Sequence, residues 1–521
     1  MIWHILKKDW KLLWKATLAV AGLHIALACL QLKTEFGGGN PVIQQFGILL
    51  MMAWLIASVI LLVMLVHQDP LPGTKQDWLV RPIRRRDVLI AKILYATLAV
   101  QGASVFGDLV QGLGSGFSLR QTVGAALVRA ATGFVAITLP SLALGALTQS
   151  VADAMVFSVV LFGGAFLFTA LAIAAGGAFD PTNGTGVEWI PNLLRYVLIF
   201  AGALAVLVVQ YRTRKTMRGR IAMAAVFLVV LCSQVMPWKP MFAVEKVFSA
   251  QSGAADAIAL AWTDRDSGQG GDLDRIPGDE KSGETRLLLP LAVSGLPMNA
   301  VLKEDKSEVS LVSAAGERLY RGNGEDIEIR HEDHASGAVR NEQVFKVPAH
   351  LLEDRKDTPV KIHAEYSLTL FALRNTYRMK AVNDDQMLAG WGRCQTKRDG
   401  AYTAIEMNCL QMGKGPTCAT VFVEYPRDGS RNKVNTACYP NYSPYLERPI
   451  PDATSHFRLI LPYRDPTGFT KFPVDAAKLA EAEIVIRVYE PVEHFTRVVD
   501  SPVTAMGDLP GVLDSSELGR H

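Results

Sequence analysis

The sequence predicts an α-helical membrane domain of about seven transmembrane helices, followed by a β-rich, sandwich-like soluble domain. Long apolar runs fill the first half and favour helices that cross a bilayer, whereas short alternating runs follow Lys239. The charge changes as well, since 20 basic and 9 acidic residues precede Glu245, against 33 basic and 41 acidic residues from there on. A chain of 521 residues with this asymmetry is expected to join two kinds of domain end to end.

Seven apolar runs in the first half are candidate transmembrane helices. A helix rises about 1.5 Å per residue, and the hydrocarbon core of a bilayer is about 30 Å thick. The first and last runs are short, and Trp14, Trp238 and Phe242 are placed to extend them as interfacial anchors. We expect spans at residues 16–32, 46–66, 88–110, 123–147, 151–175, 193–210 and 221–236.

Residues 1–15 carry tryptophans and lysines on different sides of a predicted helix. This pattern predicts an interfacial amphipathic helix before the first span. The alternative is the start of a signal peptide cleaved near residues 26–29, but six further spans would still hold the chain in the membrane.

Basic residues in the short loops predict the orientation, because Lys and Arg are retained on the cytoplasmic side. Clusters lie before the first span, between the second and third, and between the sixth and seventh, at residues 7–15, 75–86 and 212–220. We therefore expect a cytoplasmic N-terminus and, with seven crossings, an extracytoplasmic C-terminal half. If the seventh run is a hairpin or an interfacial segment instead, the soluble half is cytoplasmic.

The C-terminal half has the pattern of a β-rich domain. Turn signals such as Asn323-Gly324 and Asp428-Gly429 separate alternating segments, which predict half-buried strands. These segments are residues 286–293, 360–373, 417–425, 457–463 and 483–489. We expect four regions: the amphipathic helix (1–15), the transmembrane domain (16–242), the extracytoplasmic β-rich domain (243–506) and a loose tail (507–521).

Four of the six cysteines lie close together in the soluble half, and their even number predicts two disulfides in an oxidising compartment. They are Cys394, Cys409, Cys418 and Cys438. Three connectivities are possible, and the sequence does not separate them. Zinc is the competing interpretation, but no Cys-x-x-Cys pair and no His at ligand spacing accompanies these cysteines.

The loop between the second and third spans resembles that of permease subunits of the type-2 class of ABC exporters. The resemblance rests on Gly73 and Thr74 before Asp77-Trp78, on the run Arg81-Pro82-Ile83-Arg84-Arg85, and on Lys92 in the next span. It covers roughly residues 1–236, and it implies that loop 68–87 contacts a separate ATP-hydrolysing subunit. The implied docking residues are Asp77, Trp78, Arg81, Pro82, Arg84, Arg85 and Arg86.

The chemistry of this loop is compatible with docking. Pro82 disfavours helix at Arg81, so the chain should bend there and present the following arginines, whose planar guanidinium groups suit carboxylate partners. The competing interpretation is that membrane orientation and anionic lipid headgroups alone account for a basic loop. The chain also departs from the family, because the usual six spans become seven and the additional one would export the C-terminal domain.

Ionisable residues inside spans are candidate functional groups, because burying them in hydrocarbon is costly. Asp108 and Arg129 lie at similar depth in consecutive antiparallel spans, which predicts an intramembrane ion pair of structural role, with Arg120 as competitor for the aspartate. Lys92 and Asp153 lie near the cytoplasmic surface and are expected to reach it as anchors.

Several function classes lack their signatures. No Gly-x-x-x-x-Gly-Lys-Ser/Thr loop occurs, so we expect ATP hydrolysis on a partner chain and no enzymatic activity from this chain alone. Common metalloprotease and esterase motifs are missing too. The His-Glu-Asp-His cluster at residues 331–334 is interpreted as a solvated loop, so we expect neither metal nor cofactor, and the acidic soluble half argues against nucleic-acid binding.

We therefore expect a permease subunit of an ATP-driven exporter in a bacterial plasma (inner) membrane. Two permease chains, identical or different, would work with two ABC ATPase subunits among membrane lipids. The alternative is a membrane-anchored extracytoplasmic ligand-binding or envelope-assembly protein, for which seven spans would be extravagant. A membrane-embedded enzyme would need polar groups converging near one membrane face, and the sequence offers none.

Overall fold

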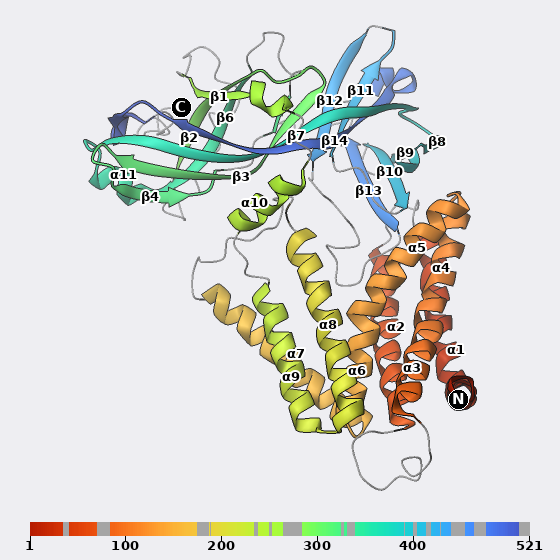
Figure 1. Cartoon of the computed structure of the whole chain (residues 1–521). Helices are drawn as coiled ribbons and strands as arrows, with labels where there is room; N and C mark the ends of the chain where they lie inside the picture. Colours follow the sequence, from red (N-terminus) through yellow and green to blue (C-terminus); the bar gives the residue numbers. More distant parts are fainter. Residues whose placement is uncertain are drawn as a thin grey trace.

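The first half of the chain is helical and the second half is β-rich, which confirms the predicted order of the two parts (Figure 1). The structure is a computed structural model. It describes residues 1–34, 41–69, 84–174, 187, 189–233, 238–249, 253–263, 284–324, 328–330, 339–389, 391–399, 404–412, 418–427, 429–438, 454–462 and 476–509.

The helical part follows the predicted apolar runs with small shifts in their ends. Its α-helices are α1 (Ile2–Thr34), α2 (Pro41–His67), α3 (Arg85–Ala96), α4 (Gly102–Gly114), α5 (Leu119–Gly133), α6 (Leu139–Leu147), α7 (Val151–Ala174), α8 (Trp189–Thr213), α9 (Thr216–Cys232) and α10 (Trp238–Phe248). The expected amphipathic helix and first span form one continuous helix, α1. The expected domain boundary at residues 242 and 243 falls inside α10.

Two of the long helices each contain one π-helical turn. The turn η2 (Thr97–Gln101) joins α3 to α4, and η3 (Phe134–Thr138) joins α5 to α6. The two turns meet inside the bundle, where the Gln101 side chain donates a hydrogen bond of 2.9 Å to the Thr138 hydroxyl. Gly133 leaves room for this contact, because a Cβ there would lie 3.1 Å from Gln101 Oε1. π-Turns interrupt regular helices most often at functional sites.

Five helices are long and apolar enough to cross a membrane, judged by length and composition. They cover Ile2–Gln31, Gln45–His67, Arg85–Gly114, Leu119–Leu147 and Trp189–Thr213. Two expected spans are not among these five: in α7 the apolar stretch that qualifies is the shorter Val151–Leu167, and α9 has 17 residues. The structure therefore supports about five spans and does not confirm the expected seven.

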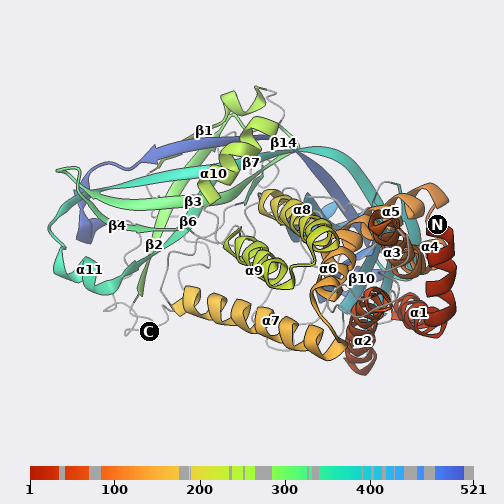
Figure 2. The same ribbon diagram turned by 60° about the horizontal axis from the view of Figure 1, so that its bottom comes forward.

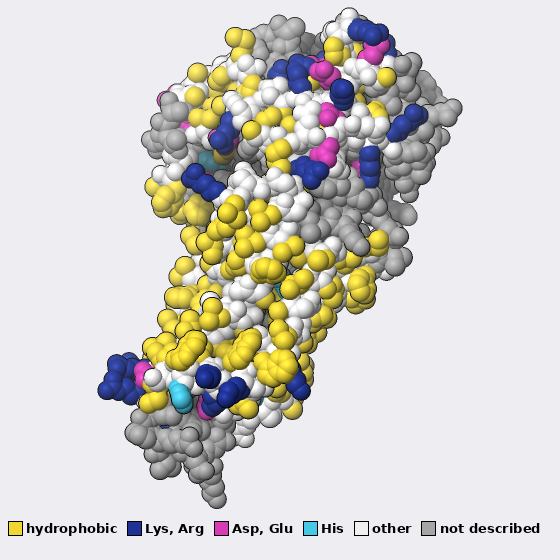
Figure 3. Space-filling model, turned by 90° about the vertical axis from the view of Figure 1, so that its right-hand side faces the viewer, with side chains coloured by type: hydrophobic (Ala, Val, Ile, Leu, Met, Phe, Trp, Pro, Cys, Tyr) yellow, Lys and Arg dark blue, Asp and Glu magenta, His cyan; other side chains and the backbone are white. Residues whose placement is uncertain are grey.

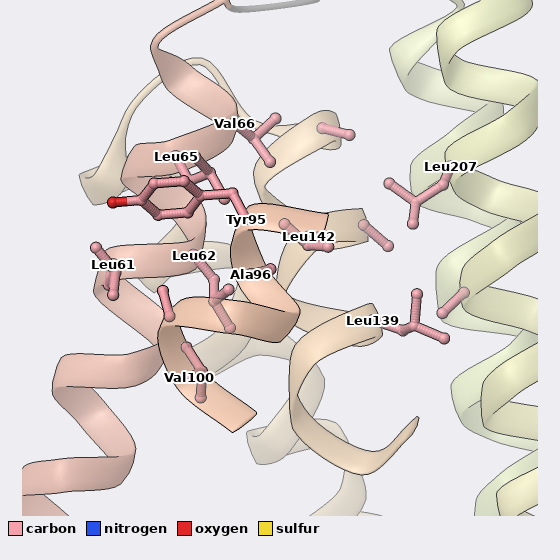
Figure 4. Close-up of a cluster of buried hydrophobic side chains, with 14 of the residues drawn as sticks. Leu61, Leu62, Leu65, Val66, Tyr95, Ala96, Val100, Leu139, Leu142 and Leu207 are labelled. Atoms are coloured by element: carbon pink, nitrogen blue, oxygen red, sulfur yellow. The ribbon is translucent and has the colours of Figure 1, made fainter. Parts of the chain in front are cut away.

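A cluster of buried aliphatic side chains holds α2, α3, α6 and α8 together (Figure 4). Leu62 and Leu65 of α2, Ala96 of α3 and Leu142 of α6 are at most 1% exposed. Small residues allow the close approach, since a Cβ on Gly145 would lie 3.2 Å from the Val63 backbone. Inside a bilayer such packing stabilises through van der Waals contact, because lipid tails are as apolar as the side chains.

Several chain segments share the lower end of the bundle in Figure 1, which we call the loop end. The N-terminus, the end of α2, the start of α3 and the turns α6–α7 and α8–α9 lie there. The β-rich domain lies at the opposite end, which we call the β-domain end. Seen from below, α7 runs across the view while its neighbours are seen closer to end-on, so it is tilted away from the bundle (Figure 2).

The β-rich domain contains an eight-stranded, a four-stranded and a three-stranded sheet among its described residues. The largest has the order β12-β11-β14-β7-β3-β4, with β15 and β5 attached, and the others have the orders β13-β10-β9-β8 and β1-β2-β6. The strands are β1 (Ala259–Trp262), β2 (Glu284–Ser294), β3 (Ala300–Ser313), β4 (Arg318–Gly322), β5 (Glu328–Arg330), β6 (Val339–Pro348), β7 (Pro359–Lys380), β8 (Asp384–Leu388), β9 (Gly392–Asp399), β10 (Ala404–Met412), β11 (Cys418–Tyr425), β12 (Ser430–Cys438), β13 (Thr454–Pro462), β14 (Glu483–Asp500) and β15 (Thr504–Ala505). All five segments expected as strands are strands.

The eight-stranded sheet takes part in two hydrophobic cores. One core joins it to the three-stranded sheet through residues such as Leu289, Phe345 and Tyr366, and the other joins it to the four-stranded sheet through Met407 and Ile484. Each fully buried side chain of this kind stabilises a water-surrounded domain by about 1.5–3 kcal/mol. The long strands β7 and β14 are paired along most of their length and contribute to both cores.

The surface of the molecule changes along its long axis (Figure 3). Apolar side chains cover the helical part between the two ends, and charged side chains gather at the loop end and over the β-rich domain. On α1 the tryptophans Trp3, Trp10 and Trp14 are exposed at 76%, 49% and 43%. This distribution is typical of a helical bundle surrounded by lipid with aromatic residues near one interface.

Candidate functional site at the two ends of the helical bundle

Four charged side chains form a network at the loop end, which we call the loop-end cluster: the buried Asp9, Asp69 and Lys92, and Lys8, whose side chain is 44% exposed. Lys92 Nζ lies 2.9 Å from both Asp9 Oδ2 and Asp69 Oδ2, and Lys8 Nζ lies 2.6 Å from Asp69 Oδ1. The side chains of Lys92 and Asp9 are 1% and 0% exposed. The two cations balance the two anions, so removing one of them would leave an uncompensated buried charge.

The loop-end cluster ties three segments together where the basic loop leaves the bundle. Lys8 and Asp9 belong to α1, Asp69 follows the end of α2, and Lys92 lies in α3. The expectation that Lys92 anchors the chain at the membrane surface is therefore wrong, because two carboxylates draw its ammonium group into the bundle. Asp153, the other expected anchor, pairs with Arg220 at 2.6 Å.

Arg85 connects the end of the loop to α8. Its guanidinium group donates hydrogen bonds of 3.3 Å and 3.0 Å to the carbonyl oxygens of Tyr211 and Arg212, in the last turn of that helix. A cation at this position also complements the helix dipole. Arg84 and Arg86 are exposed beside it. The remaining predicted docking residues, Asp77, Trp78, Arg81 and Pro82, lie outside the described residues.

The predicted ion pair between Asp108 and Arg129 is present inside the bundle. Arg129 Nη1 donates to Asp108 Oδ1, and the two residues are 9% and 2% exposed respectively. His24 of α1 is a third member, which the sequence did not indicate, with its Nε2 3.5 Å from Arg129 Nη1. Arg120, the competitor considered for Asp108, is exposed at the start of α5. We call His24, Asp108 and Arg129 the intramembrane cluster.

At the β-domain end, α10 lies between the bundle and the eight-stranded sheet. Its buried residues Trp238, Met241, Phe242 and Glu245 have the i, i+3, i+4, i+7 spacing of one helix face. The first residue of α8, Trp189, donates a hydrogen bond from its indole nitrogen to Glu245 Oε2. On the opposite face of α10, Val244 and Val247 are exposed at 38% and 77%, and Phe248 at the end of the helix is exposed at 74%. Such a helix suits the surface of a bilayer.

The sheet presents unusual residues to α10. Strand β3 carries six consecutive polar or charged residues, 303–308, and all of them are buried. The strand has a β-bulge between Glu304 and Lys306, and a bulge changes the direction of the side chains around it. Glu304 and Ser307 bind the Gln343 amide of β6, each at 2.8 Å. Asp305 instead joins the group that contacts α10.

That group, which we call the junction cluster, consists of Glu245, Asp305, Thr369 and His494. His494 Nε2 lies 3.2 Å from Glu245 Oε1, and His494 Nδ1 donates to the Thr369 hydroxyl at 2.7 Å. The hydroxyl in turn donates to Asp305 Oδ2 at 2.5 Å. Both ring nitrogens therefore face acceptors, which is the hydrogen-bonding pattern of a protonated imidazole.

Electrostatics favour that protonated state. Burial alone would lower the pKa of His494, but hydrogen bonds and charge from Asp305 and Glu245 outweigh it and raise the pKa to about 9. Burial raises the pKa of Asp305, the deeper of the two carboxyls. We attribute the cationic state of His494 to the two carboxyls together. The junction cluster is at most 5% exposed, so it suits a mechanical connection between domains better than catalysis on a substrate.

A second contact joins α10 to the same sheet through ion pairs whose cations are exposed, although Glu308 is largely buried. Lys239 Nζ lies 2.6 Å from Glu308 and 3.0 Å from Glu365, and Arg321 adds a 2.7 Å contact to Glu308. Burial of Glu308 raises its pKa, but the two cations outweigh this and lower it overall. Such partly exposed pairs contribute little to stability individually, and they position the start of α10.

The four-stranded sheet contacts the bundle at a separate place. Arg393 of β9 donates a hydrogen bond of 3.3 Å to the Ser115 carbonyl in the α4–α5 turn. Met412 of β10 packs on Ala125 of α5 and against Gly112 of α4, where a Cβ would lie only 2.2 Å from Met412 Cε. The β-rich domain is thus fixed to the bundle at two sites rather than tethered by one linker.

The cysteines of the soluble half form disulfides across neighbouring strands. Cys394 of β9 is bonded to Cys409 of β10, its direct neighbour in the sheet. Cys418 is also disulfide-bonded, and Cys438 lies opposite it in the β11–β12 register. These observations settle the connectivity of the first pair, which the sequence left open. Among the described residues, the free cysteines are Cys29 and Cys232, both in the helical part.

Sequence reasoning missed the junction cluster and His24, although signals for both exist. Trp238 and Phe242 were interpreted as membrane anchors, whereas their spacing with Glu245 marks a helix face. Asp9 precedes Thr17 by eight residues and His24 follows it by seven, which places all three on one side of α1. Within the part of the chain that the structure describes, no group of three or more His, Cys, Asp or Glu residues suits a metal ion, and residues 331–334 lie outside it.

No protein-family model and no curated protein matches this chain. The resemblance of the basic loop to type-2 ABC permeases therefore stays a proposal, and the function rests on the geometry of the two ends of the bundle.

Proposed function

We propose that the chain is the membrane-spanning permease subunit of an ATP-driven exporter, and that a separate ATPase docks on loop 68–87 at the cytoplasmic face. The observation that carries the proposal is the position of α8. Its C-terminal turn accepts hydrogen bonds from Arg85, directly after the loop, and its first residue Trp189 binds Glu245 of α10. One helix thus connects the expected dock with the outer domain.

An ATP-driven exporter needs a rigid connection between its ATPase dock and its membrane helices, because movement of the ATPase must reach those helices. Movement of the loop acts on Asp69 and Arg85, which lie close to its two ends. The loop-end cluster passes that movement to α1 and α3, and Arg85 passes it to α8, whose packed 25 residues transmit force as a rod. Passage of substrate would follow from the resulting rearrangement of the helices. Two permease chains, the same or different, would form the complete path together with two ATPases.

We further propose that α7 and α9 cross the bilayer too, which gives seven crossings and an extracytoplasmic β-rich domain. Two features support this topology. The basic clusters of α1, of residues 84–86 and of the α8–α9 turn gather at the same end, as the orientation rule requires for cytoplasmic loops. Disulfides occur at the other end, as expected for an oxidising compartment. A multi-pass protein of the bacterial inner membrane fits both.

The alternative is a membrane-anchored ligand-binding or envelope-assembly protein. Such a receptor needs its outer domain to be accessible but does not need that domain fixed to the bundle. Here α10 and the four-stranded sheet make two separate attachments. That arrangement favours the exporter.

Charge reversal at the proposed dock tests the function. Arg84→Glu with Arg86→Glu removes two exposed cations without touching the Arg85 bonds to α8, and copurification with the proposed ATPase subunit should be lost. Lys215→Glu with Arg218→Glu is the matched control, since it reverses two exposed cations in the α8–α9 turn at the same end. Equal association of both double variants with the ATPase would reject loop 68–87 as the dock.

A further inference from the structure

The intramembrane cluster has more structure than a simple ion pair requires. His24, Asp108 and Arg129 come from three helices, α1, α4 and α5, and meet at one guanidinium group. They are 2%, 2% and 9% exposed. An ion pair alone would need only the aspartate and the arginine, so the histidine calls for an explanation of its own.

The bundle is shaped to hold this histidine. A Cβ on Gly107 would lie 2.6 Å from His24 Cδ2, so only glycine fits beside the ring. The ring of Trp54 packs on the other side, with its centroid 5.0 Å from that of the imidazole. Among the described residues, Trp54 Nε1 is buried without a hydrogen-bond partner of normal geometry, and the imidazole of His24 lies beside the backbone of Ser104 on α4. Buried polar groups of this kind need an explanation beyond packing.

Among the described residues, two charged side chains define the state of His24. Arg129 faces it from α5 and Asp108 lies beyond the guanidinium on α4, while α2 contributes Trp54 and no charged side chain between residues 43 and 66. Arg129 can only donate, so His24 Nε2 accepts and the ring is neutral. With Asp108 ionised, the cluster as a whole has no net charge.

One added proton changes this balance. Whether it binds to His24 or to Asp108, it leaves a net positive charge inside the apolar bundle, and a protonated His24 can no longer accept from Arg129. Burial of that charge is costly, so the protonated cluster is stable only where water reaches it. Proton binding is therefore linked to separation of α1 from α5.

Polar side chains connect the cluster to the β-domain end. Gln111 and Ser115 follow Asp108 at i+3 and i+7 on α4, Thr122 precedes Arg129 by seven residues on α5, and all three are buried. This seam ends at the α4–α5 turn, where Arg393 of the β-rich domain contacts the Ser115 carbonyl. Water can enter along it at a smaller cost than through aliphatic packing.

We propose that the intramembrane cluster is a proton-binding gate. The described structure is its closed, deprotonated state, and a proton that reaches the cluster along the polar seam from the β-domain end separates α1 from the α4–α5 pair. The gate needs no ATPase, so it stands or falls independently of the proposed docking function.

Trp54 provides a reporter for the experiment. The purified full-length chain is placed in lipid nanodiscs without ATPase, and its tryptophan fluorescence is titrated from about pH 8 down to about pH 3, because burial and the nearby Arg129 charge oppose protonation of His24. We expect a pH-dependent component in the wild type that disappears in both Trp54→Phe and His24→Gln. A wild-type titration that superimposes on that of Trp54→Phe overturns the proposal.

Opening is measured separately with acrylamide, a polar quencher. The quenching constant of the Trp54 component should be larger at the acidic end of the titration than at the basic end in the wild type, and independent of pH in His24→Gln. Equal wild-type constants at both ends would show that the cluster binds a proton without opening, which contradicts a gate. The wild-type comparison is decisive even if His24→Gln fails to fold.

Discussion

Replacement of His494 by glutamine should destabilise the attachment of the β-rich domain to α10. The pKa of His494 rises from 6.5 to about 9 on folding, which corresponds to about 3 kcal/mol of stability below pH 6.5. Because the folded pKa is the higher one, this stabilisation is present at low pH and is lost as the pH rises from about 6.5 to about 9. Glutamine keeps a polar side chain but cannot carry the charge that balances Glu245 and Asp305.

Thermal unfolding of the full-length protein in detergent, followed at several pH values between 6 and 10, measures this effect. The wild type should lose stability across the window, and His494→Gln should start less stable and show a flatter profile. His363→Gln is the matched control, because His363 makes a 2.7 Å contact with Asp500 but is 39% exposed. Exposed pairs contribute only about 0–1 kcal/mol.

Parallel plots of stability against pH for the wild type and His494→Gln would refute the reasoning. If His494→Gln loses stability between pH 6.5 and 9 with the same slope as the wild type, His494 does not carry a proton into the junction cluster. Glu245→Gln provides a second test. This variant should lose stability at a lower pH than the wild type does, but its stability should still depend on pH.

Three further perturbations give defined outcomes. Arg129→Ala should lower thermal stability or transport, and Asp108→Ala should mask most of that loss in the double variant, whereas strictly additive losses in the cycle would rule out the pair. Lys92→Met should cost about 3–5 kcal/mol, because it leaves the buried Asp9 carboxylate without its 2.9 Å partner, and a melting temperature equal to that of the wild type would contradict this. Reduction of the Cys394–Cys409 disulfide should cost about 3 kcal/mol for a loop of this length, read as a lower melting temperature with reductant.

The two-part architecture could be predicted because it depends on local composition. Apolar runs such as residues 46–66 and alternating runs such as residues 360–373 carry their own structural preference. The ion pair of Asp108 and Arg129 was also accessible, because helix length and direction fix the depth of each residue in a bilayer.

The junction could not be predicted in the same way. Residues 303–308 have the composition of a solvated charged run, and their burial depends on partners far along the chain, including Gln343, Thr369 and His494. Likewise, Lys92 seemed free to reach the membrane surface until Asp9 and Asp69 were brought beside it. Contacts between residues far apart in the chain decide which charged side chains are buried, and these contacts cannot be predicted from a single sequence.

The continuity of β7 and β14 has a consequence for how the outer domain can move. With 22 and 18 residues, these strands form a common spine for the lobe above α10 and the lobe above the α4–α5 turn. The two lobes therefore cannot move independently. Displacement of either attachment to the bundle must twist or tilt the whole β-rich domain. If the chain is an exporter as proposed, substrate that leaves the helices would meet one rigid β-rich domain and not two independently moving lobes.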